Sequence, residues 1–336
     1  MHYCVEQLSS RELKNSIKIG TRDSQLAIWQ ATLVQQLLQK DNIFSELVYI
    51  KSEGDMDTIT PLYELGVQGI FTRSLDTALL NNKIDIAVHS LKDIPTTPAE
   101  GVEISAILKR DSYKDILVFN GDERKMKEDL GLVDGEWSPG SNHSTNLVIA
   151  TSSIRRMAQW KHRYPNHTFE NLRGNVNTRL RKLKENNWNG AIFAGAGLER
   201  INIRPENSID LDWMLPAPAQ GAIAITCRSD DASSKEICRG LNDEATQLST
   251  QAERDFLRTL MGGCSTPISA LAIINNGTMH FRGSICSPDG LQKFDIEKNS
   301  HTRDCYEIGK EAANELLKNE QARSVMYNLE NGEEKI

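Results

Sequence analysis

One arrangement of residue types occurs twice in the sequence, and it limits the folds that the chain can adopt. Residues 17–20 are typical of a short strand and residues 147–150 of a buried one, and a turn rich in Thr and Ser follows each of them. A helix comes next, with arginine in the turn or at the helix start. Hydroxyl groups can cap such helices, and the starts of helices bind anions. The repeat therefore predicts two similar α/β lobes with a ligand cleft between them.

Further apolar runs extend this repeat. Strands are expected at 47–50, 84–89 and 103–108 with helices between them, and this βαβαβ order predicts a parallel sheet with helices on both faces. Residues 115–119 begin a second unit, and 222–227 form a strand that can return to the first lobe. A chain of 336 residues is long enough for two or three domains. The expected domains are lobe 1 (16–110 with 222–240), lobe 2 (114–216) and a small α+β domain (244–330).

The stretch from Ile84 to Pro95 ends a predicted strand with polar side chains. Its first half is apolar, and its second half places Ser90, Lys92 and Asp93 in a tight turn that Pro95 closes. Open α/β sheets usually bind ligands at the carboxyl ends of their strands. The pattern by itself also fits a solvated Lys-Asp pair at the end of a strand.

The distribution of charge indicates an anionic ligand. Residues 151–184 contain nine basic side chains and one acidic side chain, which gives this segment a formal charge of +8 in a chain whose net charge is −7. Nucleic-acid binding is a weaker interpretation, because no known reader motif frames the aromatic residues of the segment and the whole chain is acidic. A solvated helix face is the expectation for five of the basic residues: Lys161, Arg163, Arg181, Lys182 and Lys184.

The six cysteines lie far apart and form no C-x-x-C pair, which argues against zinc fingers and a disulfide framework. Cys264 differs from the others, because Gly262, Gly263 and Pro267 hold it on an exposed turn. A loop cysteine alone is most often a bystander. No apolar run reaches membrane-spanning length and the first sixteen residues are polar, so we expect a cytoplasmic protein without a membrane partner.

These motifs together resemble the porphobilinogen deaminase (hydroxymethylbilane synthase) family over about residues 17–300. Each motif alone has low specificity, but six of them in one order are specific. The motifs are Thr21–Ser24, His89–Pro95, Thr151–Arg156, Leu172–Val176, Gln220–Ala222 and Gly262–Cys264. The resemblance implies two periplasmic-binding-protein-like α/β lobes around a cleft and a small α+β C-terminal domain.

The resemblance also implies an activity. A family member joins four porphobilinogen molecules head to tail into hydroxymethylbilane, with loss of ammonia, in tetrapyrrole (haem) biosynthesis. The growing chain is built on a dipyrromethane cofactor, which is expected here as a thioether on Cys264. The family further suggests a monomer, and the expected partner is porphobilinogen, with no nucleic acid and no metal.

The family's functional residues transfer to matching positions. Asp93 is the expected catalyst, because its carboxylate can stabilise positive charge on pyrrole nitrogens and carry the proton that lets ammonia leave. The expected cofactor-binding residues are Cys264, Ser90, Lys92, Asp93, Ser153, Arg155, Arg156, Arg173 and Gly174. The expected substrate-binding residues are Arg22, Ser24, Arg155, Arg179 and Gln220.

The chain also departs from the family. Glu64 and Gln68 stand where lysine is common, Ile59 replaces a usual aspartate, and the insertion at 120–146 has no function that we can assign. A non-catalytic two-lobe module that binds anions or solutes is the alternative function. Such a module would need neither the Cys264 loop nor a third domain.

Overall fold

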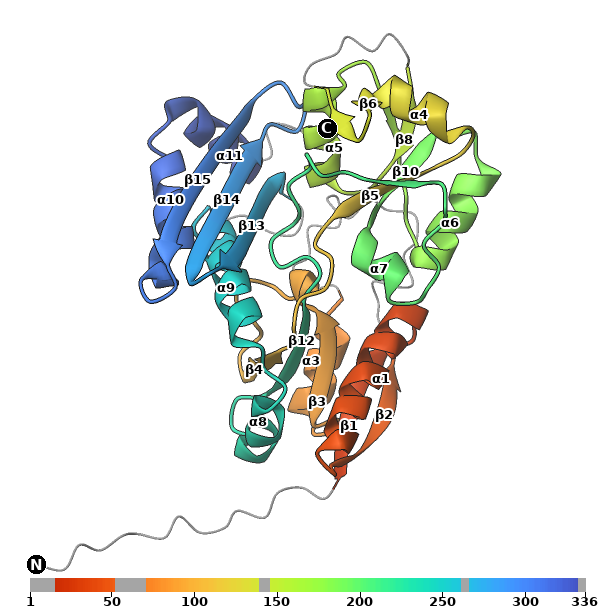
Figure 1. Cartoon of the computed structure of the whole chain (residues 1–336). Coiled ribbons are helices and arrows are strands. Elements are labelled where there is room, and N and C mark those ends of the chain that lie inside the picture. Colours follow the sequence, from red (N-terminus) through yellow and green to blue (C-terminus); the bar gives the residue numbers. More distant parts are fainter. Residues whose placement is uncertain (1–15, 52–70, 139–145, 261–265, 332–336) are drawn as a thin grey trace, which may run out of the picture.

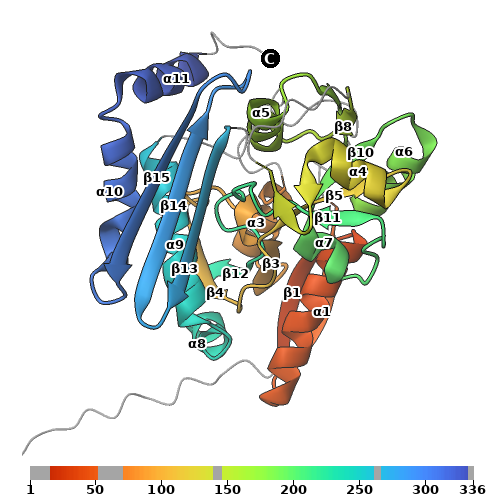
Figure 2. The same cartoon turned by 45° about the horizontal axis from the view of Figure 1, so that its top comes forward.

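The structure is a computed structural model that describes residues 16–51, 71–138, 146–260 and 266–331. Figures 1 and 2 show two α/β lobes placed end to end and a third domain that lies along their side. Within the described residues, no helix is both long and apolar enough to span a membrane.

Lobe 1 is built on a five-stranded sheet in the order β2-β1-β3-β12-β4. β1 runs parallel to β2 and β3, whereas β12 runs antiparallel to β3 and β4. The four strands predicted to form a parallel sheet do run parallel. β12, for which the sequence predicts only a return to lobe 1, is antiparallel because it comes from lobe 2 and enters the sheet at the end where β3 leaves it. The strands are β1 (Ser16–Arg22), β2 (Phe44–Ile50), β3 (Ile86–Ser90), β4 (Val102–Ile107) and β12 (Ile223–Arg228).

Helices cover both faces of this sheet, as the sequence predicts. α1 (Gln25–Lys40) and α8 (Ala232–Arg239) pack on one face, and α3 (Arg73–Leu80) packs on the other. Val34 and Leu38 of α1 are fully buried one helical turn apart. Each fully buried aliphatic side chain contributes about 1.5–3 kcal/mol to the stability of the fold.

Lobe 2 is built on a second five-stranded sheet in the order β11-β5-β10-β8-β9. β5 runs antiparallel to β10 and β11, while β10 and β9 run parallel to β8. Because side chains alternate along a strand, Leu117 and Phe119 face α4 and α5, whereas Ile116 and Val118 face α6 and α7. The strands are β5 (Asp115–Phe119), β8 (Val148–Ala150), β9 (Thr168–Glu170), β10 (Gly190–Ala194) and β11 (Ser208–Asp210). The helices are α4 (Glu123–Leu130), α5 (Ile154–Arg163), α6 (Val176–Glu185) and α7 (Gly195–Glu199).

The segment 120–146, expected as a surface insertion, contributes to the core of lobe 2 where the structure describes it. The short helix expected there is α4, and its Met126 and Leu130 are buried in the same cluster as Trp160. A small hairpin of β6 (Leu132–Val133) and β7 (Glu136–Trp137) follows. The apolar side of α4 therefore makes this segment part of the lobe.

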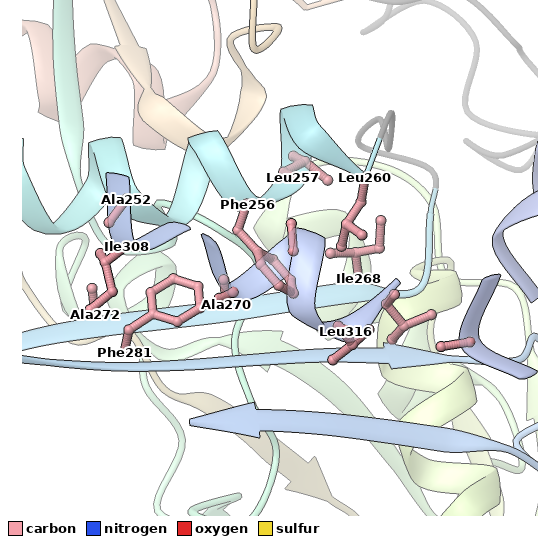
Figure 3. Packing of buried hydrophobic residues seen from close by; sticks show 14 of the residues in the cluster. Ala252, Phe256, Leu257, Leu260, Ile268, Ala270, Ala272, Phe281, Ile308 and Leu316 are labelled. Carbon is pink, nitrogen blue, oxygen red and sulfur yellow. The ribbon is translucent and has the colours of Figure 1, made fainter. Parts of the chain in front are cut away.

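The third domain packs helices against a three-stranded antiparallel sheet, as expected for an α+β unit. Its elements are α9 (Glu244–Thr259), β13 (Ile268–Asn275), β14 (Thr278–Cys286), β15 (Lys293–His301), η2 (Cys305–Glu307), α10 (Ile308–Leu316) and α11 (Glu320–Asn331). Figure 3 shows Phe256 of α9 and Phe281 of β14 in its core, and their ring centroids lie 5.3 Å apart. α10 approaches α9 so closely that a Cβ on Gly309 would lie 2.0 Å from the carbonyl oxygen of Ala252.

The carboxylate of Glu253 on α9 ties the third domain to the two segments that join the lobes. It is fully buried and accepts hydrogen bonds from Arg110 Nη1 at 2.6 Å and Nη2 at 3.1 Å. It also accepts from the backbone N–H groups of Ala219 at 2.6 Å and Ala272 at 2.8 Å. A single buried carboxylate therefore contacts both connecting segments and β13, and it fixes α9 beside the junction of the lobes.

Candidate active site

β3 ends in a short 3-10 turn, η1 (Leu91–Asp93), which places Asp93 at the carboxyl edge of the lobe 1 sheet. Leu91 is fully buried, and its N–H donates to the carbonyl oxygen of Ala222 at 3.0 Å. The turn cannot continue as a helix, because Pro95 lacks an N–H group. The strand and the turn that the sequence predicts here are confirmed.

Asp93 shares a small pocket with residues from the start of the chain. Arg22, Gln30 and Ser90 line this pocket together with Asp93. Gln30 Nε2 donates to Ser90 Oγ at 2.9 Å, and the Arg22 guanidinium lies 5.0 Å from the ring centroid of Phe71. The turns after β1 and β3 thus meet at one edge of the sheet, where open α/β sheets bind ligands.

The third domain holds the Asp93 turn in place. Arg254 of α9 is buried, and its guanidinium donates to the carbonyl oxygens of Ile94 at 2.9 Å and Pro95 at 2.7 Å. A weaker contact of 3.4 Å reaches the carbonyl oxygen of Leu91. The motifs in the sequence do not indicate this residue, because its partners are about 160 residues away along the chain.

Two buried arginines and one buried carboxylate form the part of the site that lobe 2 supplies. Asp115 Oδ1 accepts from Arg156 Nε at 3.0 Å and Nη2 at 2.7 Å, and Asp115 Oδ2 lies 2.7 Å from Arg155 Nη2. Burial alone raises the pKa of this carboxyl, but the two guanidiniums, helped by Gln220 and Lys92, lower the pKa to about 2. No motif in the sequence marks Asp115 as a site residue, although an acidic residue at the start of an otherwise apolar strand is an available signal.

Gln220 connects Asp115 to Lys92 and therefore connects the two lobes. Gln220 Oε1 accepts from Lys92 Nζ at 3.1 Å, and Gln220 Nε2 donates to Asp115 Oδ1 at 3.0 Å. The turn that presents Gln220 depends on Gly221, whose φ is +88°. A Cβ at Gly221 would also lie 2.5 Å from the carbonyl oxygen of Ser112.

The ammonium group of Lys92 lies among charges of both signs. Burial lowers its pKa, and Arg156 and Arg155 lower it as well, whereas Asp93 and Asp115 raise it. The net result is a pKa of about 8. Lys92 is therefore a cation at neutral pH that loses its proton under mildly alkaline conditions.

Arg173, Gly174 and Arg179 come from the start of α6 and the turn before it. Gly174 has a φ of +109°, and its carbonyl oxygen accepts from Arg179 Nε at 2.7 Å. Burial, together with the cations Arg156 and Arg173, lowers the pKa of Arg179 to about 10, and Asp93 opposes this shift. The structure thus brings Arg179 within electrostatic reach of charged groups from both lobes.

Ser24 and Ser153 occupy the N-cap positions of α1 and α5. Ser24 Oγ accepts from the N–H of Ala27 at 3.3 Å, so the predicted cap is confirmed there. Among the described residues, the Ser153 side chain makes no capping hydrogen bond, and the cap predicted for α5 is wrong in this respect. The neighbouring Ser152 Oγ instead accepts from the N–H of Leu172 at 2.9 Å, which ties this turn to the segment before α6.

The other basic residues of lobe 2 only partly match the solvated face predicted for them. Arg181 is exposed and pairs with Glu185 on the same helix at 2.5 Å, as such a face would. For Arg163 the prediction is wrong, because its guanidinium lies 5.1 Å from the Trp213 ring centroid and donates to the carbonyl oxygen of Ser138 at 2.8 Å. Arg163 therefore packs the described end of the 120–146 segment onto the lobe.

Cys264 lies outside the described residues, as do Ile59, Glu64 and Gln68. The four cysteines that the structure describes are all buried: Cys227, Cys238, Cys286 and Cys305. Burial raises the pKa of all four thiols, to about 12 for Cys238 and Cys286. A raised pKa suppresses the reactive thiolate, so none of these four is a candidate nucleophile.

Two family models match most of the chain. Residues 17–236 match the model described as "Porphobilinogen deaminase, dipyromethane cofactor binding domain". Residues 247–318 match the model described as "Porphobilinogen deaminase, C-terminal domain".

Individual relatives agree with these models. The "Probable porphobilinogen deaminase" of Methanocaldococcus jannaschii is 43% identical over 82% of this chain and 90% of its own length. The "Porphobilinogen deaminase, chloroplastic" of Pisum sativum is 39% identical over 93% of this chain and 84% of its own length. Among solved structures, the methionine binding protein MetQ is 12% identical over 71% of this chain and 91% of its own, with a TM-score of 0.40. From the family models and the sequence relatives, the chain belongs to the porphobilinogen deaminase family.

Proposed function

We propose that the site around Asp93 is the active site of a hydroxymethylbilane synthase, the transferase that joins four porphobilinogen molecules head to tail and releases ammonia at each addition. The observation that carries the proposal is that cations of both lobes surround Asp93: Arg22 lines the same pocket, and Lys92 and Arg179 interact with the carboxylate electrostatically. Porphobilinogen carries an acetate and a propionate group, so each added unit brings two carboxylates. Guanidinium groups pair with carboxylates through a planar fork, and several of them can hold a chain of such units.

The residues of the site fit the dipyrromethane cofactor of the family. The set combines the Lys92 ammonium with the guanidiniums of Arg155, Arg156 and Arg173, which are the donors that the carboxylates of a dipyrrole need. We propose that these four residues hold it, with Ser90 and Ser153 as hydroxyl donors, Gly174 where a close backbone approach is needed, and Cys264 as the covalent link. When bound, the dipyrromethane supplies the pyrrole carbon to which the first substrate is joined.

Arg22, Ser24, Arg155, Arg179 and Gln220 are the proposed substrate-binding residues. Arg22 shares the pocket with Asp93, so a carboxylate held by Arg22 would place a pyrrole beside the catalyst. Ser24 Oγ accepts from the Ala27 N–H, and its own O–H remains able to donate to a substrate carboxylate. Gln220 contacts both Lys92 and Asp115, so its influence on substrate is expected to pass mainly through them.

The proposed role of Asp93 is to stabilise positive charge that develops on the substrate. Loss of ammonia turns the incoming porphobilinogen into an electron-poor azafulvene cation. Attack by the terminal pyrrole of the growing chain then places positive charge on the nitrogen of the attacking ring. A carboxylate at contact distance would stabilise such a charge by up to about 4 kcal/mol at an effective dielectric constant near 20. Asp93 would also carry the proton that lets ammonia leave.

An intact-mass measurement combined with Ehrlich's colour reaction tests this function on the purified chain. A covalent dipyrrole, a positive colour and release of a linear tetrapyrrole from porphobilinogen would support the enzyme. An unmodified, colourless and folded chain that binds small carboxylates would favour the non-catalytic two-lobe module.

The cytoplasmic location, the monomeric state and the absence of nucleic-acid partners also remain predictions. Cell fractionation, size-exclusion chromatography with light scattering and a nucleic-acid binding assay test them. The domain limits expected from the sequence are proposals too, and limited proteolysis between 240 and 244 would test the boundary before the third domain.

A further inference from the structure

Asp115 contacts several residues of the site, although none of the sequence motifs includes it. It is fully buried at the junction of the lobes, and its two oxygens contact Arg155, Arg156 and Gln220 at 2.7–3.0 Å. Both arginines are therefore held on one side by an anion that belongs to the protein. An isolated carboxylate at this depth would be costly, and here it has three partners.

Backbone carbonyls complete the orientation of both guanidiniums. Arg155 Nη1 donates to the carbonyl oxygen of Leu215 at 2.8 Å, and Arg156 Nη1 donates to that of Ile192 at 2.9 Å. Each guanidinium is thus fixed by Asp115 and by a backbone carbonyl. Contacts on two sides restrict the rotation of a planar guanidinium, and its orientation decides in which direction its remaining N–H groups can bind a ligand carboxylate.

The contacts of Asp115 continue into lobe 1 through Gln220. Gln220 Nε2 donates to Asp115, and Gln220 Oε1 accepts from Lys92, so one amide bridges a carboxylate of lobe 2 and an ammonium of lobe 1. The carbonyl oxygen of Tyr113 accepts from the same Nε2 at 2.8 Å, so Asp115 and Tyr113 together hold the amide in this orientation. The charged groups that act on Lys92 are Asp93, Asp115, Arg155 and Arg156, and Asp115 favours the protonated ammonium.

We propose that Asp115 is a positioning residue that orients Arg155 and Arg156 toward the carboxylates of the bound dipyrrole and, through Gln220, keeps Lys92 presented as an ammonium. This inference rests on the proposed function for the identity of the ligand. The proposed effect of Asp115 on the protonation of Lys92 does not depend on that function.

The test compares Asp115→Asn with Asp210→Asn in the full-length chain. Asp210 lies in the same sheet and pairs with Lys114 at 3.0 Å and Arg204 at 2.6 Å, neither of which is a proposed site residue. The readout is the pH dependence of Lys92 acylation by a small amine reagent, measured by peptide mass spectrometry on chain without cofactor. Ion exchange separates this form from the more acidic loaded form.

We expect the acylation midpoint of Lys92 to fall by about one pH unit in Asp115→Asn and to stay at the parent value in Asp210→Asn. The share of chain that carries the dipyrrole should fall several-fold in Asp115→Asn alone. An unchanged Lys92 midpoint in folded Asp115→Asn would overturn the proposal.

A second variant tests the link between Asp115 and Lys92 if Asp115→Asn does not fold. Gln220→Met keeps the contacts of Asp115 with both arginines but removes the bridge to Lys92. The Lys92 midpoint should fall in this variant, and an unchanged midpoint would overturn the bridge. If the parent chain never carries a dipyrrole, the proposed function fails, while the Lys92 measurement still decides the role of Asp115.

Discussion

The guanidinium of Arg254 lies 2.7 Å from the carbonyl oxygen of Pro95, so a helix of the third domain holds the turn that carries Asp93. The same helix, α9, carries Glu253, whose carboxylate contacts both segments that join the lobes. In the sequence, α9 ends at Thr259, five residues before Cys264. One helix therefore connects the proposed catalyst, the junction of the lobes and the segment that bears the proposed cofactor link.

Replacing Arg254 with Met should weaken both stability and turnover. The carbonyl oxygens of Ile94 and Pro95 would lose charged donors in a buried place, and such hydrogen bonds contribute about 1.5–3 kcal/mol each. We expect a lower thermal midpoint and a kcat at least about tenfold lower, because the Asp93 turn is no longer fixed. Arg258→Met is the matched control, because Arg258 lies one turn later, is half exposed, and has Asp255 as its ion-pair partner among the described residues. Equal effects of both variants on kcat would argue against a positioning role for Arg254.

Uptake of the cofactor should weaken as the pH rises through about 8. The pKa of Lys92 lies well below its ordinary value of 10.5, so the ammonium is present below pH 8 and is lost above it. The loss removes one cation that would bind the carboxylates of the dipyrrole. The measurement is the rate at which unloaded chain acquires the mass of the dipyrrole from porphobilinogen between pH 6.5 and 9.5.

Lys92→Arg is the control for this pH dependence, because arginine keeps its charge throughout this range. The rate of cofactor uptake by Lys92→Arg should not decrease near pH 8, and the variant should still acquire some cofactor. The same profile in the parent chain and in Lys92→Arg would assign the pH dependence to another group.

Replacing Cys264 with Ser should prevent the covalent attachment. A hydroxyl is a much weaker nucleophile than a thiol and cannot form the thioether. The intact mass of Cys264→Ser should therefore equal that of the bare chain, whereas Cys286→Ser should carry the full adduct, because Cys286 is buried with a raised pKa. A wild-type adduct mass on Cys264→Ser would contradict the assignment.

Arg163 should matter for stability and not for catalysis. Its guanidinium packs on the rings of Trp213 and Trp137 and donates to the carbonyl oxygen of Ser138. We expect Arg163→Met to lower the free energy of unfolding by about 1–3 kcal/mol at unchanged kcat. Exposed Arg181→Met should change neither. A large loss of kcat in Arg163→Met would place the 120–146 segment in the functional machinery.

Local sequence patterns predict the parts of the site that depend on local structure. The apolar run of β3 followed by Pro95 predicts the position of Asp93, and the turn before α5 predicts that Arg155 and Arg156 lie at a helix start. The direction of β12 could not be predicted in the same way. It depends on the path of the connector that leaves lobe 2, and the alternation of side chains along a strand does not determine the direction in which the strand runs.

The missed residues act through contacts that are remote in the sequence. Asp115 meets Arg156 across 41 residues and Gln220 across 105, and Arg254 meets Pro95 across 159. A buried acid in an apolar strand could have indicated that Asp115 has a cationic partner. Its partners, however, are identified only once the lobes are folded against each other.

The proposed role of Asp93 can be tested most directly by measuring the turnover of Asp93→Asn beside its intact mass. Asparagine keeps the size of the side chain but removes the charge, so the variant should fold, carry the dipyrrole and turn over porphobilinogen about a hundredfold or more slowly than the parent. Asp41→Asn, at the exposed end of α1, should turn over at the parent rate. Near-normal turnover by a loaded Asp93→Asn protein would show that the charge of Asp93 does not drive the reaction.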